Sequence, residues 1–194
     1  MAWIVEDRRK GYEKRAEPYL TDDMKIDIGK KYFPRYPTKR AVLLPALHAI
    51  QHEYGWIPMQ AIEEVAAFLE ISPAEALDAA SFYEEYWLKP KGKYLVQVCR
   101  SLACEICGSR AVTDRVKKKL NIEAGETTPD GKFTLVELEC LGSCGTAPAA
   151  LVNEVLYENV TPEQMDQILD KLPEDPHQHQ DPLINWDAQE PKGH

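Results

Sequence analysis

The sequence has 194 residues, a formal net charge of −9 and a hydrophobic fraction of 44%. This length suits one domain or two small ones, and the ordinary apolar content excludes a chain that is disordered throughout. The acidic balance argues against a nucleic-acid partner, because a phosphate-binding surface requires clustered Lys and Arg. No stretch is apolar over the roughly 18 residues that a membrane span needs, and the N-terminus has no signal-peptide core. We therefore expect a soluble, cytoplasmic protein.

The first part of the chain is predicted to be helical. A helix over residues 22–32 is weakened by Gly29, which is unfavourable inside a helix. A longer helix over residues 38–55 carries apolar side chains at helical spacing, with Pro45 expected to bend it and Gly55 to end it.

Two more helices follow in the same half. One begins near Pro58 and again places its apolar residues on one face. The next has a clear start, because Ser72 as N-cap, Pro73 and Glu75 form a capping box. Its apolar pattern runs towards Trp87.

A polar run of Pro, Gly and Lys over residues 89–93 marks a boundary, and the hydrophobic period changes after it. Strands are expected over residues 94–98 and 133–138, with a helix over 105–120 between them. The remaining elements are two short strands over 149–152 and 155–157, joined by a tight turn, and a last helix from Thr161 to about Leu172. This order is typical of a small α/β layer domain.

All five cysteines lie in this second part. In a reducing cytoplasm such a concentration indicates metal binding or catalysis rather than structural disulfides. Four of them form two pairs, Cys99-x4-Cys104 and Cys140-x3-Cys144, and each pair lies just beyond a predicted strand. Adjacent strands would present both loops at one edge of the sheet. Four thiolates are what a [2Fe–2S] cluster needs, two on each iron.

Two other interpretations of the cysteines stay open. Four thiolates also suit structural zinc, although zinc pairs usually have the closer C-x2-C spacing. Cys104 and Cys107 do have that spacing, and it is also typical of a thiol–disulfide enzyme. The thiol–disulfide interpretation leaves Cys99, Cys140 and Cys144 unexplained. Cys107 is expected to be a small buried hydrophobe and not a ligand.

The chain resembles the 24-kDa-type [2Fe–2S] subunit family of NADH:quinone oxidoreductase, the respiratory complex I. The resemblance covers about residues 20–172 and rests first on the two cysteine pairs, with CLGSCG at 140–145. The helical half adds QHEYGWIP at 51–58 and ASFY at 80–83, where Ser81 replaces the threonine of the family. Cys107 stands where the family usually has an aliphatic residue.

The resemblance implies an α+β chain in two parts, a helical bundle followed by a thioredoxin-like domain that carries one [2Fe–2S] cluster. The domains expected on this basis are an N-terminal extension at 1–20, the bundle at 21–89, the cluster domain at 90–172 and a Pro-rich acidic tail at 173–194.

The resemblance also implies a ligand set, which consists of Cys99, Cys104, Cys140 and Cys144. No catalytic residue is expected in this chain.

The function implied is electron transfer inside a larger complex. FMN and NADH are expected in a larger flavoprotein subunit, because this chain has neither a G-x-G-x-x-G nor a P-loop motif. Further peripheral-arm subunits are expected as partners, on the cytoplasmic side of the inner membrane. Related subunits also serve NAD-linked hydrogenases and formate dehydrogenases, and the sequence does not separate these from the quinone-linked enzyme.

Overall fold

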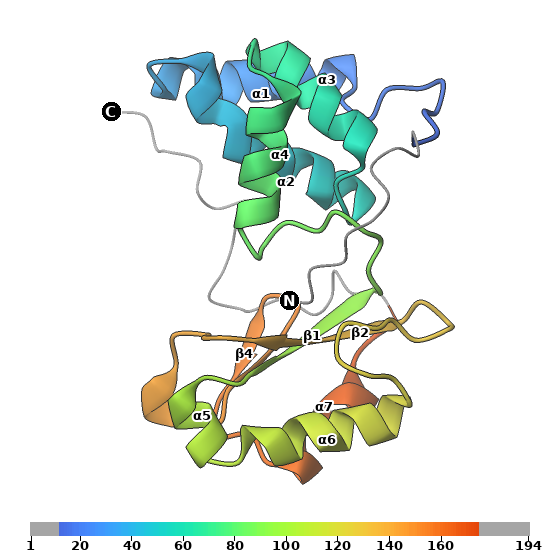
Figure 1. Cartoon of the computed structure of the whole chain (residues 1–194), viewed down its shortest axis with the longest axis vertical. Coiled ribbons are helices and arrows are strands. Elements are labelled where there is room, and N and C mark those ends of the chain that lie inside the picture. The colour runs from blue at the N-terminus through green and yellow to red at the C-terminus, as the bar shows by residue number, and fades with distance from the viewer. Residues whose placement is uncertain (1–11, 175–194) are drawn as a thin grey trace. The chain divides into compact units, whose positions relative to one another are not determined.

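Figure 1 shows the computed structural model of the protein, which describes residues 12–174. The chain divides into two compact units, one up to Pro90 and the other from Lys91. The expectations for the first eleven residues and for the tail after Glu174 lie outside the described residues.

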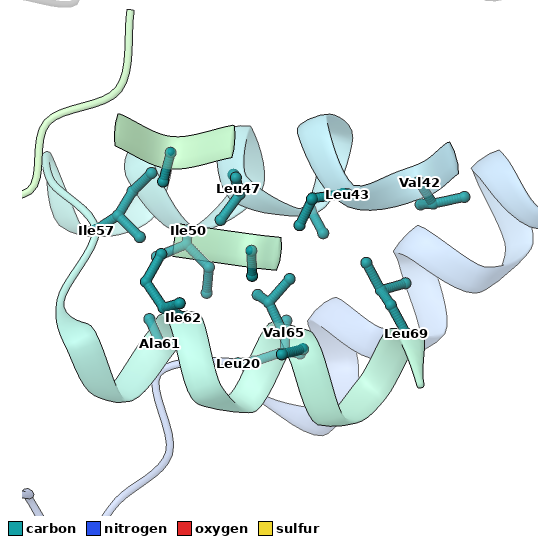
Figure 2. Close-up of a cluster of buried hydrophobic side chains, with 14 of the residues drawn as sticks. Leu20, Val42, Leu43, Leu47, Ile50, Ile57, Ala61, Ile62, Val65 and Leu69 are labelled. Atoms are coloured by element: carbon teal, nitrogen blue, oxygen red, sulfur yellow. The ribbon is translucent and has the colours of Figure 1, made fainter. Parts of the chain in front are cut away.

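The first unit contains four α-helices and two short 3₁₀ turns among its described residues. The helices are α1 (Asp22–Tyr32), α2 (Leu43–Tyr54), α3 (Met59–Leu69) and α4 (Pro73–Phe82), and the turns are Phe33–Arg35 and Lys39–Val42. Their apolar faces meet in one core, in which Leu47, Ile50 and Ile62 are fully buried (Figure 2). The capping box at Ser72 is present with both of its hydrogen bonds.

Two details of this unit differ from the sequence prediction. The α-helix begins at Leu43, so Pro45 lies in its first turn, where the missing N–H costs no hydrogen bond and no bend is needed. The α4 helix ends at Phe82 and does not continue towards Trp87. The chain that follows is instead held by Gln51, whose amide donates to the Glu85 carbonyl and accepts from the Trp87 N–H, both at 2.8 Å.

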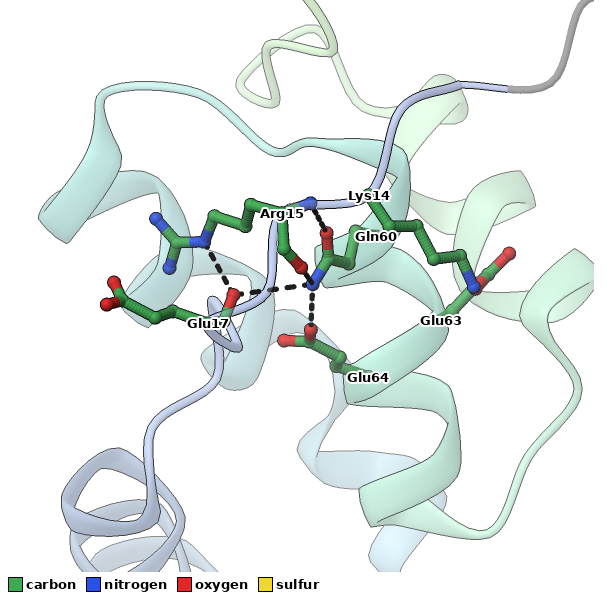
Figure 3. Close-up of polar contacts among 6 residues, drawn as sticks. All are labelled: Lys14, Arg15, Glu17, Gln60, Glu63 and Glu64. Atoms are coloured by element: carbon green, nitrogen blue, oxygen red, sulfur yellow. Dashed lines mark hydrogen bonds and ion pairs between the residues drawn. The ribbon is translucent and has the colours of Figure 1, made fainter.

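The residues before α1 pack against α3. Gln60 accepts a hydrogen bond from the backbone N–H of Arg15 at 2.9 Å, and the Glu64 carboxylate accepts one from the Leu20 N–H at 2.8 Å. Figure 3 shows the contacts of Gln60, which also donates to Glu64 at 2.8 Å. The Arg15 guanidinium lies 3.6 Å from the centre of the Tyr19 ring, as in a cation–π contact.

The second unit is a four-stranded sheet in the order β2-β1-β3-β4, covered by helices on one face (Figure 1). The strands are β1 (Tyr94–Cys99), β2 (Phe133–Leu138), β3 (Ala150–Val152) and β4 (Val155–Tyr157), and the helices are α5 (Leu102–Ile106), α6 (Ser109–Leu120) and α7 (Pro162–Lys171). The first two strands are parallel, and the other pairings are antiparallel. Alternate residues of β1 pack against α6 and α7, because strand side chains point to opposite faces in turn.

The single helix expected over residues 105–120 is two helices. Gly108 has a φ of 95°, a left-handed conformation that an α-helix cannot continue through, and it separates α5 from α6. The remaining elements of the unit agree with the sequence prediction, including the capping box at Thr161 that opens α7. The α+β fold class with an N-terminal helical part is confirmed. None of the described helices has the length and apolar character needed to cross a bilayer.

Candidate metal centre

The cysteine pairs leave the sheet at the same edge. Cys99 is the last residue of β1 and is paired in register with Leu138, the last residue of β2. Parallel strands that end together place their following loops side by side. Beyond β1, Cys104 lies on the short helix α5. Beyond β2, Cys140 lies two residues after the last strand residue. The Cys99 sulfur lies 4.0 Å from the carbonyl oxygen of Glu139, next to Cys140. The expected placement of both loops at one edge is confirmed.

The four thiols form two neighbouring pairs. Burial is the main cause that raises the pKa of the Cys104 thiol, and its hydrogen bond and charge interaction with Cys99 raise it further. The charge of Cys140 is the main cause that raises the pKa of Cys144, followed by their hydrogen bond. The charge of Cys144 also raises the pKa of Cys104, and the charge of Cys99 also raises the pKa of Cys144. Because the pKa values of Cys104 and Cys144 are raised, a cation that compensates the negative charge favours their thiolate forms.

Backbone N–H groups point at two of the sulfurs. Gly142 donates to the Cys140 sulfur at 3.3 Å, and its φ of 75° is one that glycine adopts without strain. A hydrogen bond from the Ala149 backbone lowers the pKa of Cys104, against the effect of burial. Such donors stabilise thiolate ligands and influence the reduction potential of a bound iron centre.

The site is half buried and half open. Cys99 and Cys104 are each 2% exposed, whereas Cys140 and Cys144 lie at the surface. Cys107 is also exposed, so the expectation that it is a buried hydrophobe is wrong. The reason is Gly108: the helix stops there, and Cys107 caps α5 without joining the core face of α6.

One contact near the site is not indicated by any sequence pattern. The Glu158 carboxylate, which follows β4, accepts hydrogen bonds from the hydroxyls of Ser143 and Thr146 on either side of Cys144. These donors lower the pKa of Glu158. No local pattern could have revealed this contact, because the partners are 15 and 12 residues apart and belong to different loops.

The donor set suits a two-iron cluster. All five cysteines are free thiols. Within residues 12–174, no group of three or more His, Cys, Asp or Glu side chains is placed to hold a metal ion. Four of the cysteines lie as two pairs on two loops at the same sheet edge, and a [2Fe–2S] cluster takes two thiolates on each iron.

Comparison with known families agrees with this arrangement. The family model described as thioredoxin-like [2Fe–2S] ferredoxin matches residues 29–173. The chain belongs to this family. The thioredoxin-like fold and the single [2Fe–2S] cluster expected from the sequence are thereby confirmed. The zinc and thiol–disulfide interpretations lose their basis.

Curated relatives within the thioredoxin-like [2Fe–2S] ferredoxin family are subunits of one kind of enzyme. A subunit of NADH-quinone oxidoreductase from Rickettsia bellii is 45% identical over 150 residues, which cover 77% of this chain and 89% of the relative. NADH-quinone oxidoreductase subunit 2 of Thermus thermophilus is 41% identical over 150 residues, covering 76% of this chain and 83% of the relative. The resemblance to this subunit family of NADH:quinone oxidoreductase is confirmed, and the relatives are subunits of an oxidoreductase.

A solved structure shares the arrangement of elements. An NAD⁺-reducing [NiFe]-hydrogenase in its H₂-reduced state aligns with a TM-score of 0.58 and 25% identity over 74% of this chain. The aligned part is 24% of the hydrogenase chain, so this protein spans about a quarter of that chain's length. The [2Fe–2S] family and these relatives support a role in electron transfer.

Proposed function

We propose that this chain is the electron-transfer subunit of an NADH-quinone oxidoreductase and that Cys99, Cys104, Cys140 and Cys144 hold its cluster. The supporting observation is that two strands end in register, so that the loops carrying the two cysteine pairs leave the same edge of the sheet. When bound, the cluster supplies a one-electron acceptor and donor. The chain's own residues supply the thiolates and backbone donors, and they leave one side of the site open.

The partner that we propose is a larger flavoprotein subunit that binds NADH and FMN. NADH gives up a hydride, which carries two electrons, and a flavin can accept it and release single electrons to an iron–sulfur centre. This chain has no nucleotide-binding motif of its own. We infer exchange of single electrons between FMN and this cluster, with further peripheral-arm subunits nearby on the cytoplasmic side of the inner membrane.

The surface beside the cysteines supports contact with another protein. The short helix α5 buries Cys104 but leaves Leu102 and Ile106 exposed by 75% and 77%. Large apolar side chains that remain this exposed next to a functional site are typical of protein interfaces. A partner bound there would also shield the open side of the site from water.

A second candidate function is supported by the structural likeness to the hydrogenase chain. In that case the chain would serve the NAD-linked module of a hydrogenase or a formate dehydrogenase. The cysteine geometry and the exchange with flavin would be the same, and only the remaining subunits would differ. Purification under anaerobic conditions, with every bound subunit identified, separates the two candidates.

The electron exchange is tested by combining the chain with its flavoprotein partner and reducing the complex with NADH. Electron paramagnetic resonance should show the signal of a reduced [2Fe–2S] centre assigned to this chain. The matched control is the same complex made with Cys140→Ser, which should lack that signal while keeping the flavin. Exchange is excluded if the centre in the intact complex stays oxidised with NADH but is reduced by dithionite.

A further inference from the structure

The turn that carries Cys144 has few constraints of its own. It is a three-residue 3₁₀ turn (Cys144–Thr146), and no side chain caps its start. A Cβ atom placed on Gly145 would meet nothing within 4 Å, and Cys144 itself is exposed. Packing of Cys144 and Gly145 therefore does not hold this turn. Its position depends on the Thr146 N–H bond to the Ser143 carbonyl at 3.2 Å, on packing of Ala147 and on hydrogen bonds to neighbouring chain.

The segment after β4 supplies those hydrogen bonds. The backbone N–H of Asn159 donates to the Thr146 carbonyl at 2.8 Å, and the N–H of Val160 donates to the Pro148 carbonyl at 2.9 Å. Both donors precede α7, whose start is fixed by the capping box at Thr161. A segment anchored in the sheet on one side and in a capped helix on the other is a rigid support for the turn.

Glu158 adds the side-chain contacts. Its carboxylate accepts from the Ser143 hydroxyl at 2.6 Å and also from the Thr146 hydroxyl, and these two hydroxyls lie 2.5 Å apart. Ser143 directly precedes Cys144, and Thr146 ends the turn. One carboxylate thus spans both ends of the turn, which is the geometry of a brace.

We propose that Glu158 is a positioning residue that fixes the Cys144 thiolate through Ser143 and Thr146. It acts on the geometry of the turn and does not itself contact the iron centre. The inference rests on the proposed function in one respect, because it takes Cys144 as a ligand. Partners that orient metal ligands in this way typically change metal affinity or activity by about 10–100-fold when they are removed.

The test compares variants of the full chain carrying its cluster, purified anaerobically. Glu158→Ala removes the brace, and the double variant Ser143→Ala/Thr146→Val removes its two donors but keeps the charge. A triple variant combines these three substitutions. Glu158→Gln keeps an oxygen that can accept from both hydroxyls. The control is Glu163→Ala, an exposed carboxylate on the first turn of α7.

The readouts are the visible circular dichroism of the cluster, its reduction potential and its rate of release to an iron chelator. Glu158→Ala and the double variant should each change the dichroism and release the cluster roughly tenfold faster, the lower end for such partners. The triple variant should be no worse than either, because all three residues form one network. Glu158→Gln and the control should resemble the unchanged chain.

Three results would overturn the inference. The first is an unchanged rate of cluster release in Glu158→Ala. The second is a triple variant in which the effects of Glu158→Ala and the double variant multiply. The third is a Glu158→Gln variant that behaves like Glu158→Ala. The last would mean that charge acts instead of the brace. A parallel Cys144→Ser variant separates the ligand assignment of Cys144 from the positioning role of Glu158. If Cys144→Ser keeps a native cluster, the ligand assignment fails. If Cys144→Ser loses the cluster while Glu158→Ala keeps a native one, only the positioning role of Glu158 is refuted. Far-ultraviolet dichroism of every variant checks that the chain is folded.

Discussion

Cys99 and Leu138 are the last register partners of two parallel strands, and the N–H of Arg100 still donates to the Leu138 carbonyl at 2.8 Å. The two chain segments therefore separate only one residue beyond the first cysteine. Cys140 follows Leu138 by two residues, so it begins its loop beside Cys99. Two cysteines that are far apart in the sequence are brought together by strand pairing and not by a local motif.

The first prediction concerns which cysteines hold the cluster. Cys140→Ser should lose iron and sulfide, whereas Cys107→Ser should keep both, because Cys107 caps α5 on the outside. The measurement is iron and sulfide per chain, with absorbance above about 400 nm as the optical sign of an iron–sulfur centre. A colourless Cys107→Ser protein would contradict the assignment.

The second prediction concerns Gly92. A Cβ atom at this position would lie 2.7 Å from the backbone carbon of Phe133, and the Gly92 N–H donates to the Thr134 hydroxyl at 2.7 Å. Gly92→Ala forces the start of β1 away from β2 and should lower the free energy of unfolding of the second unit by about 1–3 kcal/mol. Denaturant unfolding of the full chain, followed by a probe in each unit, measures it.

Gly29→Ala is the matched control for that substitution. Its Cβ would lie 3.7 Å from the Phe33 ring, which is an ordinary contact, and Gly29 lies inside α1. Alanine there should raise the stability of the first unit by about 0.5–1 kcal/mol, since glycine is unfavourable inside a helix. Equal effects of the two substitutions would refute the steric argument.

The third prediction concerns the helical core. Leu47 is fully buried in a core to which all four helices contribute residues, and Figure 2 draws it with residues of α2 and α3. Leu47→Ala should destabilise the first unit by about 2–5 kcal/mol, because it removes apolar contacts and leaves a cavity. The unfolding midpoint of that unit should fall while the iron content of the second unit stays constant. Loss of the cluster together with the helices would argue against separate cores.

The fourth prediction concerns pH. The Arg115 guanidinium holds the pKa of Asp166 below its usual range, through hydrogen bonds between α6 and α7. A carboxyl whose pKa is lowered by folding contributes stability above its unfolded pKa and loses it as pH falls through the folded value. Asp166→Asn should therefore be less stable at pH 7, and its difference from the unchanged chain should disappear in acid.

The measurement is the free energy of unfolding from pH 7 down to about pH 3, which covers the range in which an aspartate titrates. Asp170→Asn is the control, since Asp170 pairs with Lys119 on the same two helices but is 66% exposed. Its effect should be smaller, because exposed ion pairs contribute little. A constant difference between Asp166→Asn and the unchanged chain across this range would contradict the linkage.

The parts of the structure that the sequence predicts well are those with local chemical causes. Ser72 and Thr161 start helices where their capping boxes indicate, and the largely apolar run that ends at Cys99 is a strand. Two cysteine pairs after two strands are sufficient to place both loops at one edge. The break at Gly108 escapes prediction because a single glycine within a helical pattern does not by itself show where a helix ends, and the unexpected exposure of Cys107 follows from that break.

Contacts between distant loops could not be predicted. The Ala149 backbone donor to Cys104 and the Glu158 carboxylate beside Ser143 depend on how β3 and β4 return past the cysteines. A single exposed glutamate in a sequence carries no sign of such a partner.

The hydrogen bonds of Gln51 decide where the helical unit can be cut for separate study. Its buried amide is satisfied by the backbone of Glu85 and Trp87, beyond the end of α4, and the Ile57 N–H also donates to the Trp87 carbonyl at 2.7 Å. A fragment ending at Phe82 would leave the Gln51 amide without these partners, at a cost in stability. A fragment extended through Leu88 retains them and is the better starting point for spectroscopy of the isolated bundle.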